Sequence, residues 1–187
     1  MTDKQERRGK HRRFSDRRVH LLLAIHEILF DGEDEQQRDD ALVEEIRADF
    51  ESDRAAIVAP GGDGVGVELR SLAGQWNGVP RGSRLEGPGL SDLLEVHHLA
   101  SGAVTLTYTR RPSAFTTAGW ERLWSGDLGA PATALLSVPI VPRRAGTGYL
   151  WLQQASYSRE WSSQDRELAE EVAALLSRAA DKALRGS

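Results

Sequence analysis

Apolar residues recur every three or four positions in two segments near the start of the chain. Residues 19–30 carry one such stripe, and residues 35–50 carry a second beside a run of acidic side chains. A period near 3.6 is typical of an amphipathic helix that packs its apolar side on a core. Two helices are therefore predicted, with a break between them at Asp31-Gly32.

The pattern then changes to the period of a strand. Residues 55–59 are continuously apolar, as in a buried strand, and residues 65–69 alternate between apolar and polar or small side chains. The segment 60–64 is rich in glycine and suits a tight turn. These features together predict a β-hairpin.

The rest of the chain alternates between the two periods. Further strands are predicted at 104–108, 133–141 and 147–152, short helices at 91–99 and 115–124, and a final helix from Ser162 onward. Residues 73–89 contain many Gly and Pro residues without a sustained period, which predicts a long surface loop. The element order predicts an α+β fold with a central antiparallel sheet.

Four single residues refine these boundaries. Ser91 is a candidate N-cap and Gly102 a candidate terminator of the helix at 91–99. Ser162 and an acidic residue three positions later, Asp165, approximate a capping box. Pro139 lacks an N–H group, so it predicts either an edge-facing position or a bulge in its strand.

The chain has 187 residues, of which 40% are hydrophobic and 28% charged, as expected for a single globular domain. Residues 1–20 hold eight Lys or Arg and three Asp or Glu, a net charge of +5, so the total of −4 leaves −9 for the remainder. We therefore predict a basic, flexible arm at 1–18 and one domain at 19–187.

The complete absence of cysteine excludes disulfides, thiolate zinc sites, iron–sulfur clusters and a cysteine nucleophile. It also fits a reducing compartment. We predict no signal peptide, because the apolar stretch at 21–29 is interrupted by His26 and Glu27, and no apolar run has the length that a membrane span needs. A cytoplasmic protein without a membrane partner is expected.

Three passages resemble the GAF domain family. They are residues 53–58 at the first strand, the Val-Pro strand 135–140 with its partner 148–152, and residues 159–165 before the final helix. The resemblance covers roughly residues 19–185. It implies a GAF/PAS-like sheet with the N- and C-terminal helices on one face, and short helices and loops forming a ligand pocket on the other.

The resemblance also implies a sensory or regulatory domain that binds a small molecule and signals through its terminal helices to a partner protein. Large aromatic rings can stack on a flat ligand, although core packing explains them nearly as well. The candidate ligand-binding residues are Trp76, His97, Tyr108, Trp120, Trp124 and Ser137.

Several chemistries are not expected. Adjacent side chains of a helix point about 100° apart, so His97 and His98 do not suit one metal, and haem ligation is not favoured. Covalent bilin attachment and methionine sulfoxide reduction in this family need cysteine, and the cyclic-nucleotide signature is missing, since Asn77 is the sole asparagine. With no catalytic motif present either, we do not predict an enzyme.

Two other functions stay open. The pocket could be filled by its own side chains, leaving an interaction module that regulates a signalling partner. The basic arm could instead bind nucleic acid through its charge. In either case, the apolar faces of residues 19–30 and 162–184 predict a homodimer built from the terminal helices.

Overall fold

The structure is a computed structural model that describes residues 3–31, 35–61, 66–100, 102–142 and 146–186. Residues 62–64 of the predicted turn at 60–64, and Val65 of the second predicted strand, lie outside this part of the chain. So do residues 143–145, within the turn at 142–146 that the sequence predicts between the last two strands. No described helix has both the length and the apolar character that crossing a membrane requires.

A six-stranded antiparallel sheet forms the centre of the molecule, with strand order β3-β2-β1-β6-β5-β4. The strands are β1 (Arg54–Pro60), β2 (Val67–Gly74), β3 (Arg84–Leu85), β4 (Val104–Thr107), β5 (Ala134–Ile140) and β6 (Gly148–Gln154). The predicted α+β fold is confirmed, and the described parts of the predicted strands belong to one sheet. The sequence pattern missed β3, which lies inside the predicted loop.

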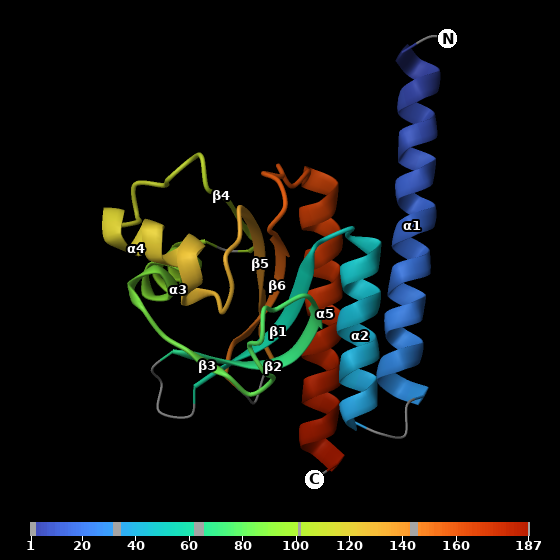
Figure 1. Cartoon of the computed structure of the whole chain (residues 1–187). Helices are drawn as coiled ribbons and strands as arrows, with labels where there is room; N and C mark the ends of the chain where they lie inside the picture. Colours follow the sequence, from blue (N-terminus) through green and yellow to red (C-terminus); the bar gives the residue numbers. More distant parts are fainter. Residues whose placement is uncertain (1–2, 32–34, 62–65, 101, 143–145, 187) are drawn as a thin grey trace.

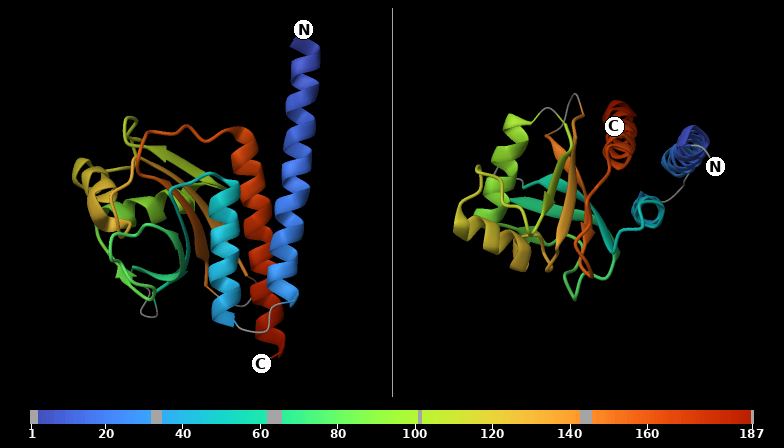
Figure 2. Two further views of the ribbon diagram at one scale, coloured as in Figure 1. Left: turned by 45° about the vertical axis from the view of Figure 1, so that its right-hand side comes forward. Right: turned by 90° about the horizontal axis from the view of Figure 1, so that it is seen from above.

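Helices cover both faces of this sheet (Figures 1 and 2). The helices are α1 (Asp3–Asp31), α2 (Glu35–Asp49), α3 (Pro88–Leu99), α4 (Thr117–Arg122), the π-helical turn η1 (Leu123–Asp127) and α5 (Ser163–Gly186). On one face α2 packs on β1 and β2, and α5 packs on β5 and β6. On the other face lie α3, α4 and η1.

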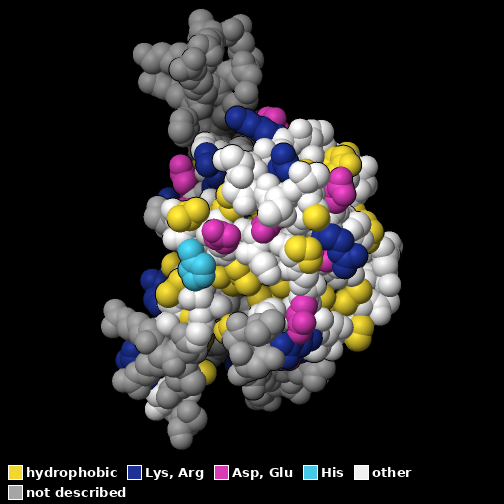
Figure 3. Space-filling model, turned by 90° about the vertical axis from the view of Figure 1, so that its left-hand side faces the viewer, with side chains coloured by type: hydrophobic (Ala, Val, Ile, Leu, Met, Phe, Trp, Pro, Cys, Tyr) yellow, Lys and Arg dark blue, Asp and Glu magenta, His cyan; other side chains and the backbone are white. Residues whose placement is uncertain are grey.

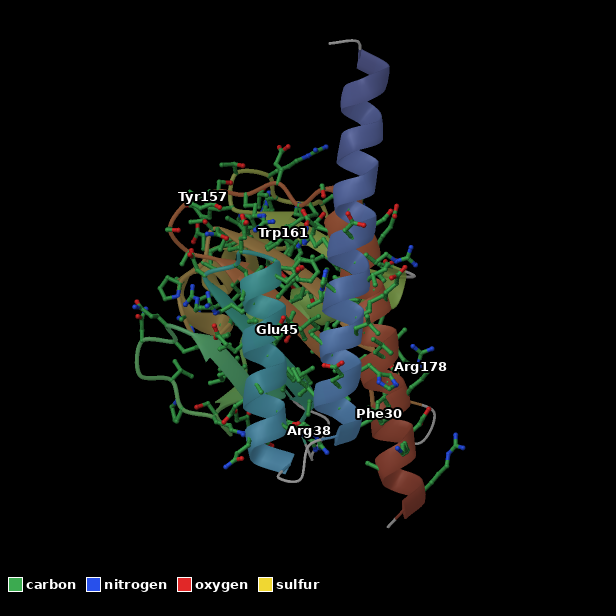
Figure 4. All side chains as sticks on the ribbon, turned by 90° about the vertical axis from the view of Figure 1, so that its right-hand side faces the viewer. Phe30, Arg38, Glu45, Tyr157, Trp161 and Arg178 are labelled. Atoms are coloured by element: carbon green, nitrogen blue, oxygen red, sulfur yellow. The ribbon has the colours of Figure 1, made fainter. Side chains whose placement is uncertain are left out.

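Helix α1 forms an outer layer against α2 and α5 (Figures 2 and 4). It begins at Asp3, whereas the apolar pattern predicted a start at Val19, and its first turns project past the rest of the molecule (Figure 1). The segment predicted as an arm is therefore part of α1, which runs without a break from Asp3 to Asp31. The division into a flexible arm and a domain stays a prediction.

The first turn of α3 differs from the prediction. Its N-cap is Gly87, and Pro88 occupies the first helical position, where a fixed φ and a missing N–H are well tolerated. Ser91 is thus inside the helix, and its hydroxyl donates to the Gly87 carbonyl at 3.1 Å. At the other end, the helix is capped by Ala100 in an extended conformation, two residues before the predicted Gly102.

The start of α5 confirms the predicted capping box. Ser162 N–H donates to Asp165 Oδ2 at 3.1 Å, and Asp165 N–H donates to Ser162 Oγ at 3.0 Å. Pro139 supports the edge-facing alternative. Its strand pairs with β4 only as far as Ser137, so Pro139 lies beyond that neighbour while it still pairs with Tyr149 of β6.

The sheet separates two apolar cores. The core beneath the terminal helices includes Leu21, Ile25, Ile46, Phe50, Leu168 and Val172, and the core beneath α3 and α4 includes Trp76, Trp120, Trp124, Tyr149 and Trp151. A register shift between Ile57 and Val58 changes the face that β2 presents. Leu69 consequently joins the second core, while Ser71 approaches Asp39 of α2.

Candidate functional site

The strand register places two rows of side chains across the sheet face beneath α3 and α4. One row consists of Arg54, Gln153, Leu135 and Leu106, and the next consists of Ala56, Trp151, Ser137 and Val104. Both rows mix polar and apolar groups. This face therefore carries the polar side chains that a binding site requires.

His97 and Ser137 form a direct contact across this face. His97 lies in the last turn of α3, and its Nε2 is 2.7 Å from Ser137 Oγ. Its ring also packs on Tyr149, with 4.7 Å between ring centroids. Burial, assisted by the charge of His98, lowers the pKa of His97 to about 4, so its imidazole is neutral near pH 7.

The aromatic residues of α4 and η1 pack edge to face. Trp120 lies 5.1 Å from Phe115 and 5.2 Å from Trp124, measured between ring centroids. Trp120 Nε1 donates to the Tyr108 carbonyl at 3.2 Å. Tyr108 itself lies at the rim, because its side chain reaches Trp124 only edge-on at 6.4 Å and the residue is 55% exposed.

A buried carboxylate holds this helical layer together. Asp127 accepts a 2.9 Å hydrogen bond from the Gly89 N–H in the first turn of α3, and a 3.1 Å bond from Arg122 Nε. Gly87 makes room for it, since a Cβ atom there would lie 2.3 Å from Asp127 Oδ2. The contact fixes α3 against η1 and so positions His97 over the sheet.

Trp76 belongs to a separate part of the same core. Its Nε1 donates to the Ala73 carbonyl at 2.9 Å, and the Arg54 guanidinium lies 5.5 Å from its ring centroid. Arg54 is only 2% exposed and donates to the Pro131 carbonyl. The six predicted residues thus fall into three groups: Trp76 beside Arg54, the His97–Ser137 pair, and Tyr108 with Trp120 and Trp124.

Five buried polar atoms in this region have no hydrogen-bond partner. They are Arg54 Nε, Gln153 Oε1, Trp151 Nε1, Trp124 Nε1 and His97 Nδ1. More than about 90% of buried polar groups in folded proteins are paired. Among the described residues, hydrogen-bonding capacity therefore stays unused at several points on this one sheet face.

The surface over this face shows apolar side chains between scattered charges (Figure 3). Beneath it, aromatic and aliphatic side chains occupy the space between the sheet and α3. A groove of about 530 Å³ lies instead beside α5, where Val138, Pro139 and Ala174 line its apolar part. A ligand on the candidate face would therefore have to displace side chains.

The described residues contain no group of three or more His, Cys, Asp or Glu side chains that could hold a metal ion. His97 has Ser137 and Tyr149 as its neighbours, and neither is a usual ligand for zinc or haem iron.

Sequence reasoning missed Arg54, Trp151 and Gln153. A period of two from Ala56 and Val58 would have placed Arg54 on the same sheet face, so a signal was present. Gln153 and Trp151 gave no signal of their own. Their role depends on pairing with strands that lie far away in the sequence.

Comparisons with known proteins agree with this architecture. A family model described as the GAF domain matches residues 34–180. Among solved structures, the phycoerythrobilin-bound GAF domain from a cyanobacterial phytochrome has a TM-score of 0.71 and 15% identity, covering 92% of this chain and 100% of that one. A search of curated proteins found no match.

Two further structures carry the same fold. The GAF domain from Acinetobacter phosphoenolpyruvate-protein phosphotransferase has a TM-score of 0.66 and 17% identity, covering 100% of this chain and 98% of that one. The GAF domain of a putative sensor histidine kinase from Pseudomonas syringae pv. tomato has a TM-score of 0.59 and 16% identity, covering 96% and 95%. At these identities the likeness concerns the fold alone.

Proposed function

Because this chain belongs to the GAF domain family, we propose that it is a sensory or regulatory domain that binds a small organic molecule between the sheet and the layer of α3, α4 and η1. The observation that carries the proposal is the set of five buried polar atoms without partners on that face. Binding there requires no catalytic step. The solved GAF domain with phycoerythrobilin, a bound small molecule, is compatible with this role.

The opposite sheet face is less suited to a ligand. Its core is dominated by aliphatic side chains from α1, α2 and α5, which pack directly on the strands. Trp161 Nε1 is a buried polar atom without a partner on that side, compared with five such atoms on the other face. This contrast supports sensing at the first face and transmission through the helices on the second.

Transmission would pass through the terminal helices to a partner protein. Helix α1 contacts α2 and α5 and projects beyond them, so it can report a change in their packing. Val19 and Leu23 of α1 are 56% and 57% exposed. A second copy of the chain would cover these apolar side chains, which supports the proposed homodimer.

Native mass spectrometry of freshly purified protein tests the sensor proposal. We expect a bound small molecule. Trp124→Phe should lower its occupancy because it removes an indole N–H donor, and Ser137→Leu should lower it because the larger side chain fills the space. Trp161→Phe is the matched control, since it removes an indole N–H on the helix-covered side. Its occupancy should equal that of the wild type.

The rival function is an interaction module whose core is closed by its own side chains. The close packing beneath α3 favours it. If no molecule co-purifies and none from a metabolite library raises the melting temperature, the sensor proposal is wrong and the rival replaces it.

A further inference from the structure

We propose that the bound molecule is an organic anion, bearing a carboxylate or a phosphate, and that Arg54 is the residue that pairs with it. This inference rests on the proposed function and names the chemical class of its ligand. Arg54 begins β1 on the sheet face beneath α3, in one row with Gln153, Leu135 and Leu106.

Arg54 is a buried cation without a carboxylate partner. Its side chain donates to the Pro131 carbonyl and lies over the Trp76 ring, while Nε has no partner. Within the described residues no ion pair joins Arg54 to an acidic group. The neighbouring Asp53 uses its Oδ2 to accept from Ala155 N–H at 2.7 Å and from Ser156 N–H at 2.9 Å.

This arrangement is costly for a ligand-free protein. A guanidinium carries five N–H donors in a planar fork, and a buried charge normally has a counter-charge that offsets its lost hydration. Burial lowers the pKa of Arg54, and the nearby charge of Asp53 opposes that effect only in part. A carboxylate or phosphate fits the fork in a bidentate manner and would satisfy Nε.

The surroundings of Arg54 specify more of the ligand. Gln153 pairs with Arg54 across the sheet and has an unpartnered Oε1, which can accept from a hydroxyl or N–H of the ligand. The buried Trp76 ring lies against the guanidinium and gives the site a planar, apolar border. The site therefore suits an anion attached to a planar, apolar body.

The segment that covers Arg54 connects η1 to β5. Pro131 contributes the carbonyl that the guanidinium contacts, and Gln153 Nε2 donates to the Leu128 carbonyl at 3.5 Å, a long bond. Gly129 has φ +84, a conformation that glycine adopts readily. Access to Arg54 from this side requires residues 128–131 to move, which would break these two contacts and expose Leu128 and Ala130, now 0% and 2% exposed.

The alternative is that Arg54 is structural and ties residues 128–131 to the sheet. The variant Arg54→Met distinguishes the ligand-binding role from the structural role, because it removes the charge and keeps much of the side-chain volume. If Arg54 binds the ligand, the ligand-free variant should have a melting temperature equal to or above that of the wild type. If the arginine is a structural tie, the variant melts several degrees lower.

Thermal shift measurements with defined probes test the ligand class directly. Benzoate and phenyl phosphate, at 1–10 mM, serve as planar anions, and benzamide serves as a neutral molecule of the same shape. We expect at least one anion to raise the wild-type melting temperature and benzamide to leave it unchanged. The shift should disappear in Arg54→Met, partly return in Arg54→Lys, and persist in the control Arg81→Met, whose arginine pairs with Asp40 on the surface.

The outcomes separate this inference from the sensor proposal. If a co-purified molecule is retained undiminished by Arg54→Met, or if it is neutral, the anion assignment is wrong and the sensor stands. If no probe shifts the wild type and Arg54→Met is destabilised, the arginine is structural and the inference fails. A wild-type protein that neither carries a molecule nor responds to any library compound overturns both.

Discussion

Arg17 of α1 donates a 2.8 Å hydrogen bond from Nε to Asp49 Oδ2 at the end of α2. Its other nitrogens reach the Asp49 carbonyl at 2.8 Å and Asp165 Oδ1 in the first turn of α5 at 3.3 Å. One side chain thus joins all three terminal helices. Arg159 approaches the same Asp165 at 3.6 Å, so the junction is a small ionic network in which several members are partly buried.

Replacing Arg17 by Ala should lower the free energy of unfolding by about 1–3 kcal/mol, because it leaves Asp49 partly buried without its charged donor. The adjacent Arg18→Ala is the matched control. Arg18 pairs with Glu171, and their side chains are 49% and 35% exposed, so replacing Arg18 should lower the free energy of unfolding by less than about 1 kcal/mol. Urea denaturation measures both, and equal losses would show that the network adds nothing beyond a surface pair.

Acid should destabilise the protein through His97. Its pKa is about 4 in the folded chain and about 6.5 in a solvated one, so the unfolded chain binds more protons between these values. Stability from this residue is therefore complete above pH 6.5 and declines, by up to about 3 kcal/mol, as the pH falls to 4. His97→Gln should flatten this region of the stability curve.

The exposed His98 provides the control for that measurement. His98→Gln should leave most of the decline between pH 6.5 and 4 in place, because it retains the buried imidazole. NMR titration of the histidine side-chain resonances gives the His97 pKa directly. A value near 6.5 would contradict the expected burial.

Substituting Gly87 by Ala should cost clearly more than the usual penalty for a left-handed residue. Gly87 has φ +145, and the new methyl group would displace Asp127 from its hydrogen bond to Gly89. We expect a loss of about 2–4 kcal/mol. Gly78→Ala, at φ +83 in open space, should cost only about 1 kcal/mol; thermal or urea unfolding that ranks the two equally would argue against the Asp127 contact.

Leu23→Glu should convert a dimer into a monomer if α1 supplies the interface between two copies. Leu23 is exposed on α1, and a buried charge at an apolar interface is unfavourable. Leu99→Glu, at an exposed position of α3 on the other side of the sheet, is the control and should leave the dimer intact. Light scattering after size-exclusion chromatography at micromolar concentration measures both; a monomeric wild type would end the dimer proposal.

The sequence predicted those features that depend on local periodicity. The apolar stripe of α5 and the Ser162–Asp165 box are examples, since each needs only residues one turn apart. The extension of α1 to Asp3 was missed because residues 3–18 contain a single large apolar residue, Phe14, and so show no apolar stripe. The two-residue strand β3 is too short to show a period.

The candidate site was predictable only in part. Three of the aromatic residues chosen from the sequence, Trp76, Trp120 and Trp124, lie in one core, while their contact with a ligand stays a prediction. The unpaired state of Arg54 depends on Pro131 and Gln153, which are more than 70 positions away in the chain. Composition cannot reveal whether such a charge has a partner, because that is a property of tertiary packing.

Both edge strands of the sheet are short. β3 spans two residues, and β4 spans four, so its pairing with β5 ends before Pro139. A long, exposed edge strand could pair with the same strand of another chain and start fibril formation. The edge strands β3 and β4 are themselves too short to be such a template, and beside β4 the proline adds a position that cannot donate. At high concentration, short edge strands disfavour aggregation through strand pairing. Specific association between copies is therefore expected to use the helices.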